Sequence, residues 1–592
     1  MAEPEIVAFV CNWCAYAGAD YAGVSRIQYP ANVRLIRVMC SGRVEPSFML
    51  KAFEDGADGV LVGGCHEADC HYMSGNVKAR ARVEETRSLL DLLGLGGERL
   101  RIKWVNANEG EVFASEIADF TSALKSLGPN PLKAAKPVTR GKPPVLAEIM
   151  ARTNTNLCVE CGKCTASCPV SRRLASFSPR MTVEMSLEKM ASEIETGPQL
   201  WECLTCRTCE ERCPYNVRFS DFIREARVEA QDLGLDGCPT QSGQMYSWMR
   251  MMARDGLSQQ RTGWADGFKT KARATSKNDI MFFVGCLPHF GLSHRHVGAD
   301  TLGIATNTLA ILNAMGIAPV LLADERCCGH DLLFAGEPEA FEALARRNAE
   351  AFKKAGVKRI VTACAEGYQT LAVEYPRVLE DWDVEVMHIS GLMAQAVETG
   401  NLTFENDLGL KVTYQDPCRL GRYMDEYEAP RAVLGAMPGV ELVEMEHHGP
   451  DAVCCGVSSW ISCGATAKSI QMSRLAEAKA TGADVLVTAC PKCQIHFSCA
   501  LSGRVPLERS EVEIPIEDLT SLAVKALGLS LPEPAAKKPS RASKAKPPAK
   551  AARKKSAGKA PSKASPGRKG KKPAKTPAAG SKKKTGAKSG SK

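Results

Sequence analysis

The sequence predicts a multidomain α/β protein that ends in a disordered basic tail. A length of 592 residues is enough for several domains. Short apolar runs of the kind that form buried strands alternate with longer helix-like stretches along most of the chain. The 25 cysteines are gathered in dense groups, and clustered thiols in a reducing compartment usually bind metal rather than form disulfides. We therefore expect α/β domains built around metal-binding cysteines.

Residues 1–130 are expected to form an N-terminal parallel α/β domain. Four strand-like runs, each followed by a helix-like stretch, are EIVAFV, NVRLIRVM, DGVLVGG and RIKWVNA. Each run is apolar enough to be buried on both faces, as the strands of parallel sheets are. Residues 131–144, which end the stretch GPNPLKAAKPVTRGKPP, are rich in proline and basic residues and are expected to be a linker.

Residues 145–240 are expected to be mostly helical and to hold two [4Fe-4S] cubane clusters. Two runs match CxxCxxCxxxCP, the spacing that binds such clusters: Cys158, Cys161, Cys164 and Cys168, and Cys203, Cys206, Cys209 and Cys213. In two-cluster modules the fourth cysteine of each run binds the other cluster, so the expected sets are Cys158, Cys161, Cys164 with Cys213, and Cys203, Cys206, Cys209 with Cys168. The alternative is a pair of zinc sites, for which CxxC pairs alone suffice. The proline after each run favours a two-cluster, ferredoxin-like domain.

Residues 278–400 and 408–527 are expected to be two copies of one α/β module. In each copy, strand-like runs lead into cysteines: DIMFFVG, APVLLAD and VKRIVTA in the first, and LKVTYQD, ELVEME and ADVLVTA in the second. Corresponding cysteines lie 132, 127 and 126 residues apart: Cys286 and Cys418, Cys327 and Cys454, and Cys364 and Cys490. Such a nearly constant interval is typical of an internal repeat.

Each module contains a pair of adjacent cysteines, Cys327–Cys328 and Cys454–Cys455. Adjacent cysteines rarely form a disulfide with each other, because its geometry is strained between neighbours. Each pair follows a strand-like run, and ligands of open α/β sheets gather at the carboxyl ends of strands. Thiolates that converge there select soft metals or iron–sulfur clusters. The alternative, buried cysteines acting as small hydrophobic side chains, does not explain their repeated placement at strand ends.

The pattern Cys…CysCysGly…CysxxCys resembles the cysteine-rich (CCG) modules of the catalytic B subunit of heterodisulfide reductase, and residues 145–240 resemble its C subunit. In that family a complete module holds a noncubane [4Fe-4S] cluster through five cysteines. The resemblance implies such a cluster, and the catalytic site, at five cysteines of the second module: Cys418, Cys454, Cys455, Cys490 and Cys493. The first module supplies four cysteines: Cys286, Cys327, Cys328 and Cys364. Gly367 takes the place of the fifth, so the resemblance leaves open whether the first module holds a cluster.

Residues 1–130 are similar to the D subunit of methyl-viologen-reducing hydrogenase, through CNWCAYAGAD, VMCSGR and GGCHEADCH. The resemblance implies a [2Fe-2S] cluster that passes electrons to a flavin-bearing A subunit. Five cysteines are candidates for its four ligands: Cys11, Cys14, Cys40, Cys65 and Cys70. Zinc is the alternative, because four thiolates also suit it. His66 and His71 are expected to orient their neighbours. No GxGxxG opens a helix after a strand here, so no flavin is expected in this chain.

Residues 533–592 are expected to be disordered, because lysine, alanine, proline and serine dominate and aromatic residues are absent. From Ala535 to Lys592 there are 21 Lys or Arg and no Asp or Glu, and subtracting them from the formal charge of +9 leaves −12 on the rest of the chain. Such a tail can attract nucleic-acid phosphates, although a solvated tail, or one docked on the acidic body, is the favoured interpretation. No apolar run is long enough to span a bilayer, and the N-terminus lacks a secretory signal, so a cytoplasmic location is expected.

Together the resemblances imply that this chain belongs to a soluble, flavin-linked complex, in which it transfers electrons through iron–sulfur clusters and acts as a thiol–disulfide reductase. Electrons would come from a hydrogenase or dehydrogenase partner through the N-terminal domain and pass to a flavin-containing, heterodisulfide reductase A-like subunit. They would return through the two cubane clusters to the second module, where a disulfide substrate is cleaved. The alternative is the electron-transfer subunit of a lactate- or glycolate-type dehydrogenase, which shares the tandem clusters and the modules. A nucleic-acid-associated redox sensor that uses the basic tail is a second alternative.

Overall fold

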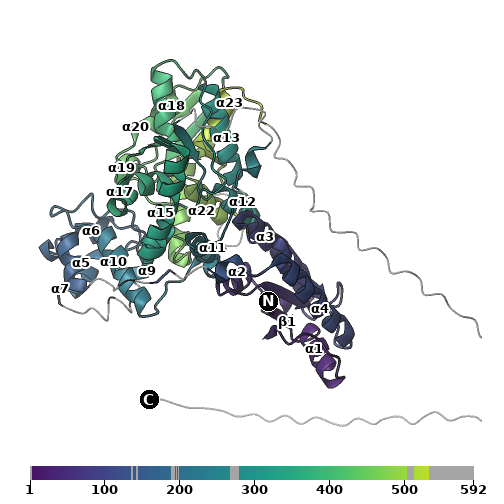
Figure 1. Cartoon of the computed structure of the whole chain (residues 1–592). Helices are drawn as coiled ribbons and strands as arrows, with labels where there is room; N and C mark the ends of the chain where they lie inside the picture. The colour runs from purple at the N-terminus through teal and green to yellow at the C-terminus, as the bar shows by residue number, and fades with distance from the viewer. Residues whose placement is uncertain are drawn as a thin grey trace, which may run out of the picture. The chain divides into compact units, whose positions relative to one another are not determined.

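The computed structural model describes residues 3–134, 138, 139, 141, 145–188, 194, 197, 199–259, 261–266, 279–502 and 512–531 (Figure 1). The tail predicted at 533–592 and most of the second half of the predicted linker lie outside these residues. Within the described residues, no helix is both long and apolar enough to cross a membrane.

The N-terminal domain is the parallel α/β sheet that the sequence predicts. Its strands are β1 (Ile6–Cys11), β2 (Val33–Val38), β3 (Gly59–Gly64) and β4 (Leu100–Trp104), in the order β2-β1-β3-β4 and all parallel. Helices α1 (Ala15–Val24) and α4 (Gly110–Leu127) pack on one face, and α2 (Pro46–Glu54) and α3 (Gly75–Leu93) on the other. The carboxyl ends of β1, β2 and β3 lead directly to the N-terminal cysteines.

The ferredoxin-like region is mostly helical, as predicted. Its helices are α5 (Leu146–Thr153), α6 (Lys163–Ser167), α7 (Pro179–Leu187), α9 (Gln199–Glu202) and α10 (Phe219–Asp232). Helix α7 lies at the start of the segment that joins the two cysteine runs. Ser178 caps this helix by accepting a hydrogen bond from the Met181 amide. A further helix, α11 (Gln244–Ala253), follows and was not predicted.

The first module contains a three-stranded parallel sheet of order β5-β6-β7. Its elements are β5 (Ile280–Phe283), α12 (Leu287–Ser293), α13 (Thr301–Ala314), α14 (His330–Ala335), α15 (Pro338–Ala355), β6 (Arg359–Thr362), α16 (Ala365–Gln369), α17 (Tyr375–Val378), β7 (Glu385–His388) and α18 (Ile389–Glu398). The strand predicted at 318–324 was wrong: only Val320 pairs with β5, through a single parallel bridge to Met281. Beyond this bridge, the amides of Val284 and Gly285, which follow β5, donate to the Glu325 carboxylate rather than to another strand. The segment after Val320 therefore does not continue as a strand.

The second module repeats this topology with a four-stranded sheet of order β11-β10-β8-β9. Its elements are β8 (Leu410–Gln415), α19 (Gly421–Met424), α20 (Glu428–Gly435), β9 (Val440–Leu442), α21 (Ala465–Ala480), β10 (Val485–Thr488), α22 (Pro491–Leu501), β11 (Ile516–Asp518) and α23 (Leu519–Ala526). Strand β9 occupies the place of the single Val320 bridge, next to the first strand of its module. The repeat inferred from the cysteine intervals therefore extends to the strand order.

The first part of the predicted linker packs against the folded chain. Leu132 is fully buried, and its carbonyl accepts a hydrogen bond from Arg254, just beyond α11. Arg250 of α11 also pairs with Glu54 of α2 at 2.7 Å. Methionines and Trp248 of α11 lie in one hydrophobic core with side chains of the N-terminal domain and of both modules. A sequence rich in proline and lysine does not reveal this, because the burial depends on α11, more than a hundred residues further on. The exact domain boundaries stay predictions.

Candidate functional site

The ferredoxin-like region contains two cavities, each lined by one of the crossed cysteine sets. Cys158, Cys161, Cys164 and Cys213 line the first, together with Val159, Tyr215 and neighbouring side chains. Cys203, Cys206, Cys209 and Cys168 line the second. Cys209 also borders the first cavity, so the two cavities are neighbours. Four sulfur donors around each cavity are the donor set that iron–sulfur clusters require.

The two cysteine runs hold their ligands with the same unusual backbone. Glu160 and Gly162 in the first run, and Thr205 and Arg207 at the matching positions of the second, have φ values of 55°, 76°, 46° and 62°. This left-handed conformation turns the Glu160 and Thr205 amides toward the sulfurs of Cys158 and Cys203, at 3.4 Å in both cases. Glycine adopts it freely, whereas a β-branched residue such as threonine needs support from its surroundings.

The five cysteines of the second module converge, and all except the half-buried Cys418 are buried. Cys454 is hydrogen-bonded to Cys418 and to Cys455. Cys455 continues the chain of thiols to Cys493, which is hydrogen-bonded to Cys490. Cys418 follows β8 and Cys490 follows β10, so the carboxyl ends of neighbouring strands deliver the thiols as the sequence predicts. The donor set suits a soft metal or an iron–sulfur cluster.

The four cysteines of the first module also lie together. The sulfurs of Cys286 and Cys327 are 3.2 Å apart, and Cys327 is hydrogen-bonded to Cys328. Cys364 lies close enough to Cys328 for the two thiols to interact electrostatically. The Gly367 amide donates to the Cys364 sulfur at 3.4 Å, so glycine stands at the predicted place of the missing ligand, directly beside the cluster of thiols.

The 203–209 loop of the ferredoxin-like region touches the second module through sulfur. Cys206 is hydrogen-bonded to Cys454, which lowers the pKa of the Cys206 thiol well below its usual value; the charge of Arg422 acts in the same direction against burial. Hydrogen bonding to Cys454 likewise lowers the pKa of Cys418, helped by the charges of Arg419 and Arg422. Cys206, a predicted ligand of a cubane cluster, is thus continuous with the thiols of the predicted catalytic cysteines.

Buried arginines that the sequence analysis did not single out surround this contact. Arg227 of α10 donates to the carbonyls of Leu200 and Cys203, each at 2.8 Å, and to that of Phe334 at 2.7 Å. Arg419 and Arg422, which follow Cys418 by one and four residues, bind carbonyls of the 203–209 loop. Their closeness in sequence to a predicted ligand could have marked them as site residues, but nothing in the sequence indicates which distant loop they bind.

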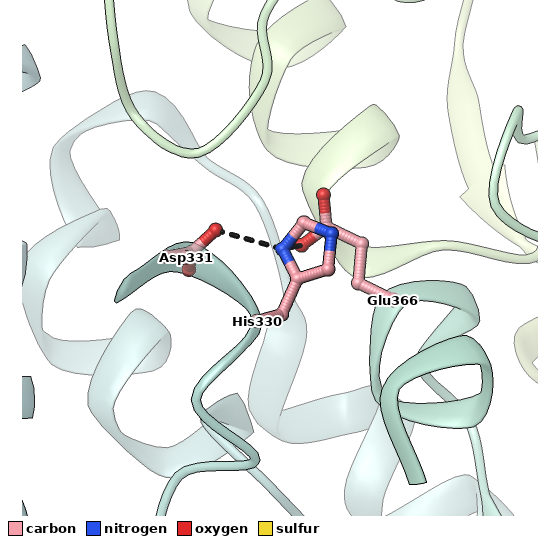
Figure 2. Close-up of side chains that lie close together, drawn as sticks. All are labelled: His330, Asp331 and Glu366. Atoms are coloured by element: carbon pink, nitrogen blue, oxygen red, sulfur yellow. Dashed lines mark hydrogen bonds and ion pairs between the residues drawn. The ribbon is translucent and has the colours of Figure 1, made fainter. Parts of the chain in front are cut away.

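A buried charged group joins the two modules. His330 and Asp331 of α14 and Glu366 of α16 point toward one another (Figure 2), with the His330 Nδ1 at 3.1 Å from Asp331 and 3.3 Å from Glu366. Such a trio can bind a metal ion, but here Lys492 of the second module forms ion pairs with both carboxylates. The group therefore already contains its cation. Glu366 and Lys492 occupy equivalent positions of TACAEG and TACPKC, a signal that the sequence analysis did not use.

The five N-terminal cysteines also converge. The sulfurs of Cys11 and Cys65 are 3.8 Å apart, and Cys14 is hydrogen-bonded to Cys65. Cys40 is hydrogen-bonded to Cys70, and burial, the largest effect on the Cys40 thiol, raises its pKa. All five candidates remain, because each lies in this group.

The two histidines of this region are engaged by side chains other than cysteine. His66 is hydrogen-bonded to Glu109 at 2.7 Å, and His71 stacks on Trp13 with 4.0 Å between ring centroids. These contacts agree with the expectation that the histidines orient neighbouring groups.

Three further cysteines, Cys238, Cys463 and Cys499, stand outside the predicted sets. The structure brings them near one another: Cys463 interacts electrostatically with the other two, and Lys468 lies 3.1 Å from the Cys499 sulfur. Sequence spacing does not reveal this, because the three come from separate segments.

Comparison with known families agrees with this organisation. Residues 6–128 match the methyl-viologen-reducing hydrogenase delta subunit family, residues 154–217 the 4Fe-4S dicluster domain, and residues 280–371 and 412–498 the cysteine-rich domain. The iron-sulfur D subunit of the F420-non-reducing hydrogenase vhc of Methanococcus voltae is 56% identical over 131 residues, which are 22% of this chain and 91% of the relative. The A subunit of the ferredoxin:CoB-CoM heterodisulfide reductase of Methanosarcina mazei is 49% identical over 126 residues, 21% of this chain but 16% of the relative.

A longer match is to a subunit of a heterodisulfide reductase. The D subunit of the dihydromethanophenazine:CoB–CoM heterodisulfide reductase of Methanosarcina barkeri is 30% identical over 407 residues, which are 63% of this chain and 94% of the relative. The two resemblances inferred from the cysteine patterns are thereby confirmed. The chain belongs to the heterodisulfide reductase D-subunit family of iron–sulfur electron-transfer proteins and carries, in addition, an N-terminal domain of the hydrogenase delta-subunit type.

Proposed function

We propose that this chain carries electrons from a partner through its ferredoxin-like region to a disulfide-reducing site in the second module. The observation that carries the proposal is the contact of the 203–209 loop with the second module at Cys206, whose carbonyl accepts a hydrogen bond from Arg422 at 2.6 Å and whose thiol interacts with that of Cys454. It joins a predicted ligand of the second cubane cluster to a predicted ligand of the catalytic cluster. Direct contact between ligand shells is the arrangement expected where electrons pass from one site to the next.

The assignment of the clusters follows the thiol groups. Two [4Fe-4S] cubane clusters are assigned to the crossed cysteine sets, a noncubane [4Fe-4S] cluster to the second module and a [2Fe-2S] cluster to the N-terminal cysteines. When bound, these clusters would supply one-electron transfer, and the reduction of a disulfide takes two electrons. The chain's own residues contribute sulfur donors, backbone amides directed at the sulfurs, and buried arginines beside Cys206 and Cys418.

The site of disulfide reduction is assigned to the second module rather than the first. Five thiols meet there, whereas the first module has four thiols and Gly367. The surroundings also differ: a hydrogen bond to another thiol and burial raise the pKa of Cys327 and of Cys328, and Asp331 adds a smaller effect in the same direction. The cations Arg419 and Arg422 lower that of Cys418. Positive charge next to a cluster ligand favours an extra electron.

The N-terminal domain is assigned as the contact with the electron-donating part of the complex. Large hydrophobic side chains adjacent to its cysteines are exposed, among them Trp13, Met39 and Tyr72, and Met73 is 90% exposed. Exposed apolar groups around a redox site indicate a docking surface. A flavin-containing A-type subunit is the proposed partner, because the same domain occurs within the A subunit of the Methanosarcina mazei enzyme.

The proposal is tested with the anaerobically reconstituted full-length protein. Iron and sulfide analysis with EPR spectroscopy is performed before and after the addition of a panel of disulfides. We expect a new EPR signal upon disulfide addition, and reduction of the disulfide with a viologen donor. Reduced protein that carries its clusters but neither changes its EPR spectrum nor consumes any disulfide would contradict the reductase assignment. Turnover with a 2-hydroxy acid as electron donor would favour the lactate- or glycolate-type alternative.

A further inference from the structure

We propose that Arg419 and Arg422 are positioning residues that hold the 203–209 loop against the second module for electron transfer, and that the first module supports them through His330. We call the three side chains the arginine junction. The inference rests on the proposed clusters, but not on the identity of the disulfide. It assigns a role to a module that lacks its fifth cysteine.

Arg419 makes the central contacts of the arginine junction. Its guanidinium donates to the Thr205 carbonyl at 2.5 Å and to the Thr205 Oγ1 at 2.9 Å. Its Nε donates to the His330 Nε2 at 2.9 Å. One side chain of the second module, 2% exposed, thus binds the cubane-ligand loop and the first module together. The fork of the guanidinium makes this three-way connection, which a lysine cannot reproduce.

Arg422 and Tyr423 hold the same loop from the next turn of the chain. The Arg422 Nε donates to the Cys206 carbonyl at 2.6 Å, and the Tyr423 hydroxyl donates to the Thr205 carbonyl at 2.8 Å. The ring of Tyr423 lies between two guanidinium groups, 4.2 Å from that of Arg419 and 3.6 Å from that of Arg207. The two hydrogen bonds and the contact with Arg207 join the second module to residues 205–207, which include Cys206.

The loop needs such support because of its backbone. Thr205 and Arg207 have φ values of 46° and 62°, where non-glycine residues are strained. The matching positions of the first cysteine run hold Glu160 and Gly162, with no arginine of a module bound to their carbonyls among the described hydrogen bonds. The second run thus has a non-glycine residue at both positions, and the arginine junction binds the carbonyls of Thr205 and Cys206 between them.

The first module holds its part of the arginine junction in place. The His330 Nδ1 lies near Asp331 and Glu366 (Figure 2). This leaves the His330 Nε2 to accept a hydrogen bond from Arg419. The same carboxylates pair with Lys492, and Glu366 also interacts electrostatically with Arg419. The ring of Phe334 stacks on His330 with 4.5 Å between centroids and fixes the plane of the imidazole.

A purely structural role does not account for this arrangement equally well. Burying charges is costly, and well-packed apolar side chains often stabilise a protein as much as a buried ion network does. The arginine junction instead concentrates positive charge next to two predicted ligands: Arg419 lies 4.0 Å from the Cys418 sulfur, and Arg422 donates to the Cys206 carbonyl at 2.6 Å. The placement of the charge matches a role in bringing an electron to this contact.

The test uses full-length protein with its clusters, a chemical reductant and no disulfide. We measure the rate at which the EPR signal of the second-module cluster changes after mixing with dithionite, and the magnetic interaction between this cluster and its neighbouring cubane. Arg419→Met is expected to slow the arrival of the electron at least tenfold and to weaken the magnetic interaction at unchanged iron content. Arg419→Lys, which keeps the charge but loses the fork, is expected to be intermediate. His330→Phe, which keeps the stack on Phe334, should slow arrival in the same direction.

Arg474→Met is the matched control, because Arg474 is fully buried in the same module and binds Gln415 and Glu477 rather than the loop. Wild-type arrival and magnetic interaction in Arg419→Met would overturn the proposal, as would an equal loss in Arg474→Met. An unchanged rate in His330→Phe would remove the supporting role of the first module. If Arg419→Met loses iron, the electron-arrival rate of Arg419→Lys is the test of the proposal. Loss of iron in Arg419→Lys as well would show that Arg419 is needed for folding and would contradict the proposal. Since no disulfide is added, failure of the reductase assay leaves this result unaffected.

Discussion

Gly367→Cys should give the first module the fifth thiol that it lacks. A Cβ atom at Gly367 would lie 3.5 Å from the Cys364 Cβ, 3.5 Å from the Thr362 Oγ1 and 3.9 Å from the Cys364 sulfur, which are ordinary van der Waals distances. Gly367 lies within helix α16, where cysteine is favoured over glycine by a few tenths of a kcal/mol. We therefore expect the free energy of unfolding to change by less than about 1 kcal/mol.

The new thiol should change the metal content far more than the stability. If the four thiols of the wild-type first module do not retain a cluster, Gly367→Cys should add about four iron atoms per chain. If those four thiols already hold a cubane cluster, the variant should instead gain a noncubane EPR signal at constant iron content. Iron and sulfide analysis with EPR spectroscopy distinguishes these outcomes. Gly367→Ser is the control, because serine has a similar size but offers no thiolate. Iron content and spectra that equal those of the wild type in Gly367→Cys, or an equal change in Gly367→Ser, would refute the reasoning.

Five other changes test the remaining assignments. Cys493→Gly, which copies the arrangement of the first module into the second, should abolish the disulfide-induced EPR signal, whereas Cys364→Ser should slow turnover and leave that signal; the reverse pattern would place the substrate in the first module. Cys206→Ser should block electron delivery to the second module while the N-terminal cluster keeps its EPR signal, and turnover at the wild-type rate would be incompatible with the proposed route. Deletion of 535–592 should leave iron content and reductase activity unchanged, and loss of iron would disprove this. Lys492→Met should lower the free energy of unfolding by about 3–5 kcal/mol, because it leaves two buried carboxylates short of a cation; an unchanged denaturation midpoint would contradict the buried ion pairs.

The spacing of residues along the chain determined much of this site. Strands β1, β5, β8 and β10 were predicted because short apolar runs with turn signals at their ends have few other stable uses in an α/β protein. The grouping of the cysteines followed from the same spacing, since thiols placed directly after neighbouring parallel strands must meet at one sheet edge. The grouping of the cysteines around two cavities in the ferredoxin-like region was predictable because the two runs are short, local and similar to each other.

Short or weakly apolar elements were harder to predict. Strands β7 and β11 were missed, and the run at 318–324 was taken for a strand although Val320 alone pairs. Three or four residues carry too little periodicity to distinguish a strand from a single bridge. The decision there depends on whether a neighbouring side chain, such as Glu325, takes over the hydrogen bonds of the sheet.

Only the tertiary structure decided which distant groups meet. Arg419 follows a cysteine in the sequence, but its partners, Thr205 and His330, lie 214 and 89 residues away. Leu132 of the linker is buried because it packs in one core with α11, and the pairing of Glu366 with Lys492 depends on how the two modules face each other. Sequence spacing fixes the residues that a strand or a tight loop brings together, because the backbone geometry there is nearly invariant. Contacts between elements depend instead on side-chain packing over the whole core, which no local pattern encodes.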